Sequence, residues 1–85
     1  CVIFNLLVEH SSEGKRKAAQ QFQMLIDCAL NEGGSFYLTY HRWARRDQVE
    51  TAYPQFRAFL EKKSHWDPTN LFSSDWYTHY SELFA

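Results

Sequence analysis

The chain has 85 residues, which suffices for one small domain and is near the lower limit for a self-sufficient hydrophobic core. Its formal net charge of −1 excludes the concentrated positive field that nucleic-acid binding requires. No apolar run approaches the roughly 18 residues of a membrane span, and no signal segment opens the chain, so we expect no membrane partner. Aromatic residues make up 18%, more than so small a core can hide, so some should face a ligand, another domain or another copy.

The first half of the sequence predicts a strand, a helix and a second strand. Residues 1–9 are dominated by Val, Ile, Phe and Leu, which favour a strand. Apolar residues then recur every three or four positions up to Asn31, which predicts a helix of four or five turns that a serine at 11 or 12 can cap. The Gly33-Gly34 pair ends it, because glycine takes the left-handed conformation of a helix C-terminus. Residues 35–43 alternate in side-chain character and predict a second strand.

The second half predicts helices. Asp47 and Glu50 fit a capping box for a short helical segment that ends at Tyr53. Pro54 would stand at the first position of a further helix, because proline disrupts a helix interior but suits its first turn. Asp67-Pro68-Thr69-Asn70 predicts a turn, and Ser74 can cap a last helix. That last helix has aromatic residues on one side: Trp76, Tyr77, Tyr80 and Phe84.

The predicted order is therefore β-α-β-α-α, an α+β fold. Two strands make a poor sheet alone, so further strands should come from a second copy or from missing chain. The sequence starts at Cys1, within a strand-like run and without an initiator Met, which favours missing upstream chain. We expect residues 1–85 to be a single C-terminal domain or fragment.

A family resemblance rests on the last third, Phe56 to Tyr80, which reads FRAFLEKKSHWDPTNLFSSDWYTHY. This amphipathic helix, Asp-Pro turn and aromatic helix, preceded by Gly33-Gly34 and Tyr53-Pro54, resembles the C-terminal end of vanillyl-alcohol-oxidase-type FAD-linked oxidoreductases. The resemblance runs from about Phe4 to Tyr80. It implies a ferredoxin-like piece of a substrate or cap domain, without the N-terminal domain that binds FAD. It also implies hydride transfer from a hydroxylated small molecule to flavin in the full-length protein, and an inactive chain on its own.

The candidate site lies in the segment from Tyr37 to Trp43, which concentrates hydroxylated aromatics, an imidazole and a guanidinium. Such a group can bind an oxygen-rich substrate or transfer a proton. The resemblance implies that this segment faces the flavin and the substrate, with the family's lysine position falling on Tyr40. We name Tyr40 and His41 as catalytic candidates, leaving open which is the base, and Tyr37 and Arg42 as substrate-binding candidates. The competing interpretation is an aromatic strand with an exposed polar end.

The resemblance also makes Asn70 and Ser74 candidates for cofactor contacts, against the competing interpretation of a turn and a helix cap. The four histidines show no spacing typical of a metal site, so we expect none. Cys1 and Cys28 form no disulfide framework, and Cys28 falls in an apolar helix pattern, where a buried free thiol is expected. This favours a reducing compartment, the cytoplasm.

The sequence is also compatible with two other functions. One is a small dimeric α+β barrel that binds or oxidises a small molecule without FAD, and the other is a non-catalytic interaction domain. A fragment of a flavoenzyme should expose apolar surface, whereas a dimeric barrel should bury Tyr37, Tyr40 and the C-terminal helix across a two-fold axis. The expected partners are a small-molecule substrate and either the missing FAD-binding domain or a second copy.

Overall fold

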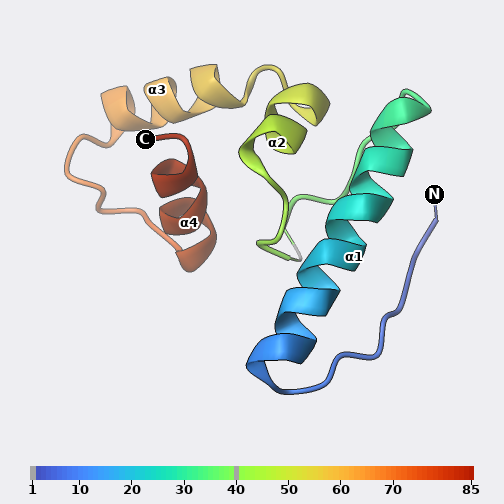
Figure 1. The fold of residues 1–85 in the computed structure, drawn as a ribbon. Helices are drawn as coiled ribbons and strands as arrows, with labels where there is room; N and C mark the ends of the chain where they lie inside the picture. Colours follow the sequence, from blue (N-terminus) through green and yellow to red (C-terminus); the bar gives the residue numbers. More distant parts are fainter. Residues whose placement is uncertain (1, 40) are drawn as a thin grey trace.

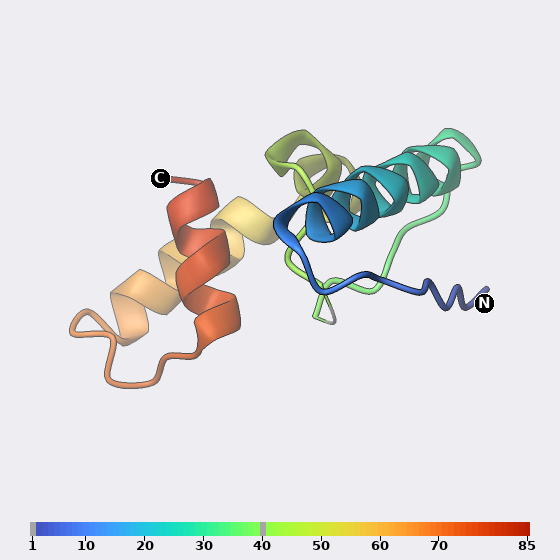
Figure 2. The ribbon, with the colours of Figure 1, turned by 60° about the horizontal axis from the view of Figure 1, so that its bottom comes forward.

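The computed structural model describes residues 2–39 and 41–85, and within them the chain forms four helices and no strand (Figure 1). The helices are α1 (Ser12–Asn31), α2 (Arg46–Ala52), α3 (Phe56–Trp66) and α4 (Asp75–Leu83). The long α1 lies on one side beside α2, and α3 and α4 form a second pair at the other end of the molecule (Figures 1 and 2). No helix in the described part of the chain is long and apolar enough to cross a membrane.

Both ends of α1 follow the predicted signals. The Ser11 hydroxyl accepts a hydrogen bond from the backbone N–H of Gly14 at 3.0 Å, which confirms a serine cap. At the other end Gly33 has a φ of 76°, and the N–H of Gly34 donates to the carbonyl of Ala29 at 2.8 Å. This is the glycine-dependent closure that the Gly33-Gly34 pair predicted.

The predicted α+β fold, with its β-α-β-α-α order and ferredoxin-like arrangement, is wrong for this chain. Residues 2–9, 35–39 and 41–43 lie outside the helices and pair with no strand among the described residues. Residues 2–9 instead run extended alongside α1, in the opposite direction (Figures 1 and 2). Strand-favouring residues form a sheet only when a neighbouring strand offers hydrogen bonds and a face to pack on, and the described part of the chain contains no such neighbour.

Helix α2 begins earlier than the sequence predicted. The N–H of Arg45 donates to the side-chain oxygen of Gln48 at 3.0 Å, which sets the start of the helix. The predicted capping box of Asp47 and Glu50 is therefore wrong, because Asp47 already lies inside the first turn. Glu50 forms an ion pair with Arg57 of α3 instead, at 2.5 Å.

Proline separates α2 from α3, as predicted, but does not start the new helix. Pro54 lies in a turn that closes with a hydrogen bond from the N–H of Phe56 to the carbonyl of Tyr53, at 3.0 Å, and α3 begins at Phe56. The predicted cap of α4 is confirmed, since the Ser74 hydroxyl accepts from the N–H of Tyr77 at 3.1 Å.

The core lies where α3 and α4 meet the connection between α1 and α2. The Phe56 ring is at its centre, with ring centroids 6.0 Å from Trp76, 5.9 Å from Tyr80 and 5.1 Å from Phe84. The contacts with Trp76 and Tyr80 are edge-to-face and add to the stabilisation from burial. The buried residues of this cluster are Ile26, Leu38, Ala44, Val49, Phe56, Tyr80 and Phe84.

The chain is less compact than its length would suggest. Its radius of gyration is 14.4 Å, against about 12 Å for a folded domain of this length. Large apolar side chains remain exposed at two ends of the molecule, on residues 2–7 and in the connection between α3 and α4. Exposed apolar surface is what the sequence analysis expected of a fragment, and that the chain is a fragment stays a prediction.

Candidate functional site

The connection between α1 and α2, which carries the predicted site, is held in place by α4. The Tyr80 hydroxyl donates to the backbone carbonyl of His41 at 3.2 Å, and Trp76 Nε1 donates to the carbonyl of Leu38 at 3.3 Å. Burial raises the pKa of the Tyr80 phenol, an effect that the positive charge of Arg42 opposes. Tyr80 therefore stays protonated and remains a donor to this backbone.

His41 belongs to an aromatic group at the surface of α1. Its ring lies nearly parallel to that of Trp43, with an interplanar angle of 3° and centroids 4.8 Å apart. The ring of Phe22, on α1, lies 4.6 Å from the same imidazole. His41 is exposed as a residue, so its imidazole is oriented by stacking while solvent and solutes reach it. A ring so placed offers its two nitrogens to a solute for hydrogen bonding.

Arg42 lies on the α4 side of the connection. Arg42 and one face of α4 together line a polar groove of about 260 Å³. The α4 residues that line this groove are Asp75, Thr78, His79 and Glu82. The groove thus presents a guanidinium opposite two carboxylates and an imidazole. It could bind a small ligand that carries both hydrogen-bond donors and acceptors.

Sequence reasoning missed the α4 side of this groove. His79 is notable, because its Nε2 is buried and has no hydrogen-bond partner among the described residues. The spacing of Asp75, His79 and Glu82, which places them along one side of a helix, was the available signal. It did not reveal that Arg42, more than 30 residues earlier in the chain, would face the same side.

The predicted catalytic and substrate-binding residues do not converge on one point. His41 lies against α1, and Arg42 faces α4. Tyr37 is exposed, and Tyr40 lies outside the described residues. His41 and Arg42 therefore share the connection between α1 and α2, but the side chain of His41 packs on α1 and that of Arg42 faces α4.

Asn70 and Ser74, the candidates for cofactor contacts, already have structural roles. The Asn70 side-chain oxygen accepts from Lys63 Nζ at 3.1 Å, and Ser74 caps α4. Both lie in the connection between α3 and α4, at the edge of the molecule opposite to α1 (Figures 1 and 2). Within this chain the two residues act as part of a turn and as a helix cap, and their contact with a cofactor stays a prediction.

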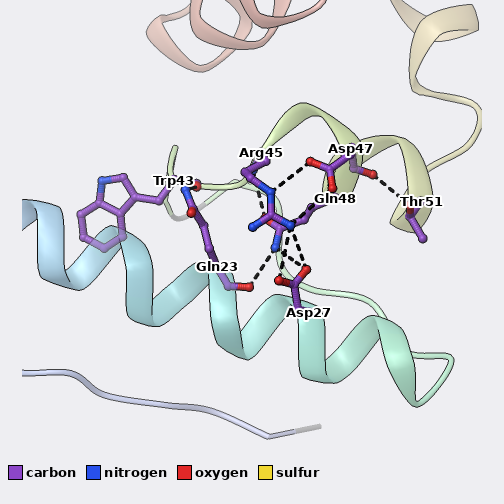
Figure 3. Close-up of polar contacts among 7 residues, drawn as sticks. All are labelled: Gln23, Asp27, Trp43, Arg45, Asp47, Gln48 and Thr51. Atoms are coloured by element: carbon purple, nitrogen blue, oxygen red, sulfur yellow. Dashed lines mark hydrogen bonds and ion pairs between the residues drawn. The ribbon is translucent and has the colours of Figure 1, made fainter.

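A polar junction between α1 and α2 positions Trp43 (Figure 3). The Trp43 ring stacks in turn on the ring of His41. Gln48 is 1% exposed, and its amide nitrogen donates to the carbonyl of Gln23 and to Asp27 Oδ1, both at 2.8 Å. The side chain of Gln23 donates in turn to the carbonyl of Trp43 at 2.8 Å. Four residues from two helices and the connection thus form one hydrogen-bonded chain.

Charge reinforces this junction. Arg45 Nη2 lies 3.0 Å from Asp27 Oδ1, and Arg45 Nε lies 3.1 Å from Asp47 Oδ1. The pKa of Asp27 lies below its usual value because of its hydrogen bonds to Gln48 and then Arg45, and Arg45 lowers the pKa of Asp47 in the same way. Both carboxylates are therefore ionised at neutral pH and hold Arg45 over the start of α2.

A second groove, of about 270 Å³, lies between α3 and α4 and is almost entirely apolar. It is lined by Leu38, Tyr53, Gln55, Phe56, Phe59 and Trp76. Within residues 2–39 and 41–85, no group of three metal-ligating side chains comes together. No family model matches the sequence, and no curated protein or solved structure matches it.

Proposed function

We propose that this chain is the C-terminal part of an FAD-linked oxidoreductase and contributes residues to the substrate side of its site. The observation that carries the proposal is surface area. The chain exposes 6674 Å², against about 5,300 Å² for a self-contained protein of its mass. A chain with so much uncovered surface is built to pack against a larger body, which in this proposal holds the flavin.

The order of sequence features selects the flavoenzyme class. A helix closed by Gly33-Gly34, the Tyr37 to Trp43 segment and the Asp67-Pro68 turn follow one another as in that family, and the helix end and the turn adopt the expected local geometry. Flavin would be bound by the remainder of the enzyme and supplies the hydride acceptor when bound. The residues of this chain would orient the substrate beside it.

The substrate class would be a hydroxylated small molecule. Arg42 would bind its oxygen atoms through guanidinium hydrogen bonds, and His41 or Tyr40 would accept the hydroxyl proton. Stacking on Trp43 orients the His41 ring for such a transfer. We place the enzyme in the cytoplasm, where the Cys28 thiol, which is exposed and not buried as predicted, would stay reduced.

A non-catalytic interaction domain is a second candidate, favoured by the exposed apolar side chains of the α3–α4 connection. In that case the aromatic side of α4 would not form the binding surface, because Tyr77 and Tyr80 are buried within the chain. The α+β barrel is excluded by the all-helical structure of the described residues.

The test is to isolate the natural gene product and measure its intact mass and visible absorbance. A polypeptide that contains this sequence and shows the two absorbance bands of oxidised flavin supports the proposal. The same product with Arg42→Ala and His41→Ala should retain its flavin bands but lose substrate-dependent bleaching. A colourless product that binds no added FAD would overturn the flavoenzyme proposal and leave the interaction domain.

A further inference from the structure

Arg42 differs from the other arginines of this chain, because it has no carboxylate partner among the described residues. The other four lie 2.5 to 3.8 Å from a carboxylate oxygen and are Arg16, Arg45, Arg46 and Arg57. Within residues 2–39 and 41–85, Arg42 forms neither an ion pair nor a hydrogen bond. Its guanidinium lines the groove on α4 and offers its five N–H donors there.

The two carboxylates of the same groove are also unpaired in the described part of the chain. Asp75 and Glu82 line the groove with Arg42, yet neither forms an ion pair. Asp75 begins α4, where the helix dipole stabilises a negative charge. Glu82 lies in the last turn, which contains no basic residue, and there the dipole opposes a negative charge. A cationic group bound beside Glu82 would therefore be attracted both by the carboxylate and by the end of the helix.

The two walls of the groove are fixed relative to each other by Tyr80. This residue is 0% exposed, and its hydroxyl donates at 3.2 Å to the carbonyl of His41, the residue before Arg42. Its ring also meets the ring of its neighbour His79 edge to face, with centroids 4.8 Å apart. The groove is thus formed before any ligand arrives, so binding does not have to order the backbone.

His79 gives a second indication that this groove holds a ligand. The residue lines the groove, and its Nε2 is buried without a hydrogen-bond partner among the described residues. Folded proteins leave few buried polar atoms unpaired. An unpaired nitrogen in the wall of a polar groove points to a bound molecule that supplies the partner.

The charges of the groove select the ligand. A purely anionic molecule would be repelled by Asp75 and Glu82, and a purely cationic one would leave Arg42 unpaired. A molecule with one carboxylate and one ammonium group complements both signs, and about 260 Å³ suits a molecule the size of an amino acid.

We propose that the groove between Arg42 and α4 binds a small zwitterion, an amino acid or a related amino carboxylate, with its carboxylate on Arg42 and its ammonium group at Glu82. This inference rests on the role of Arg42 under the proposed function, and it narrows the hydroxylated substrate to a hydroxylated amino carboxylate. Binding itself does not require flavin.

The test is a titration of the ¹⁵N-labelled 85-residue chain with L-serine in the absence of FAD, followed by ¹H–¹⁵N NMR. We expect a dissociation constant of about a millimolar and shifts of the amide signals of Arg42 and residues 75–82. Lactate has the hydroxyl and the carboxylate but no ammonium group, and ethanolamine has the hydroxyl and the ammonium group but no carboxylate. Each should bind about tenfold more weakly than serine, or less, because one of its charged contacts is missing.

Variants assign the two contacts. Arg42→Gln and Glu82→Gln should each raise the dissociation constant for serine about tenfold. Arg16→Gln and Glu61→Gln are the matched controls and should leave it unchanged, because they remove the same charges from other surfaces. All four residues are exposed, so far-UV circular dichroism should remain that of the parent chain.

The proposal is overturned if serine causes no shifts in these signals, if lactate or ethanolamine binds as tightly as serine, or if Arg42→Gln binds serine like the parent chain. The flavoenzyme proposal fails separately, on a natural gene product that is colourless and binds no FAD. Serine binding by such a product would support the zwitterion site without the flavin chemistry.

Discussion

The Tyr80 hydroxyl and the backbone carbonyl of His41 lie 3.2 Å apart and form a hydrogen bond between the last helix and the candidate site. The two residues are almost 40 positions apart in the sequence. The carbonyl of Leu38 lies 3.5 Å from the same hydroxyl. One phenol thus fixes two points of the connection that carries His41 and Arg42.

Replacing Tyr80 by Phe should lower the free energy of unfolding by about 1 kcal/mol, because the ring stays in the core while the carbonyl of His41 loses its donor. The carbonyl of Leu38 keeps the hydrogen bond from Trp76. Urea denaturation followed by circular dichroism measures the change. Tyr80→Leu should cost more, since it also removes the ring packed against Phe56. Equal stability of parent and Tyr80→Phe chains would show that the hydroxyl does not hold the connection.

Replacing Gln48 by Leu should destabilise the chain by about 2 kcal/mol, because the carbonyl of Gln23 and the carboxylate of Asp27 lose a buried donor. The replacement keeps the volume, so the effect reports on hydrogen bonding. Gln21→Leu, at an exposed position of α1, is the control and should change stability by less than about 0.5 kcal/mol. NMR should also show a shift of the His41 imidazole signals in Gln48→Leu alone.

Stability should fall as the solution becomes acidic. The pKa of Asp67 lies below its usual value because of its hydrogen bond to Lys63, and those of Asp27 and Asp47 are lowered as well. A lowered pKa in the folded state means that the folded chain binds fewer protons than the unfolded chain. The stabilisation is complete above the unfolded value of about 4 and is lost as pH falls through the lower folded values.

Thermal melts across this acidic range measure the effect. Lys63→Met removes the main cause of the shift at Asp67 and should flatten the pH dependence without removing it, since Arg45 still acts on the other two carboxylates. A steeper acid dependence in Lys63→Met would contradict the assignment.

Replacing Phe56 by Ala should destabilise the chain by about 3 kcal/mol or more, because the ring is 5% exposed and packs on Trp76 and Tyr80 of α4 and on Phe84, which follows that helix. Small domains have only about 5–15 kcal/mol in total, so a large unfolded fraction is expected. Phe59→Ala, at a half-exposed position of the same helix, should cost far less. Near-UV circular dichroism and urea titration distinguish the two variants.

Local sequence signals predicted the helix ends well. Ser11, Ser74 and Gly33 act within a few residues of their own position, and so does the Asp67-Pro68 turn, whose carboxylate bonds forward as expected. Such features depend only on residues a few positions away in the chain, so a single sequence suffices to predict them. The start of α2 was missed because it depends on the Gln48 side chain, which is also held by α1.

Long-range relationships were not accessible in this way. Alternation in residues 35–43 indicates how side chains would be arranged in a strand, but not whether a neighbouring strand exists to pair with it. For the same reason the sequence identified Arg42 but not the α4 face that it meets. The predicted flavoenzyme function depends on resemblance and surface area, and the natural gene product is the place to test it.

The apolar side chains left in water have a consequence for the lifetime of this polypeptide in a cell. Val2, Ile3 and Leu7, in an extended segment, have the features that holdase chaperones bind and that proteases cleave. Copies that find no partner should therefore be degraded faster than assembled ones. Its abundance would then follow that of whatever covers it, and pulse-chase labelling of the chain measures its lifetime directly.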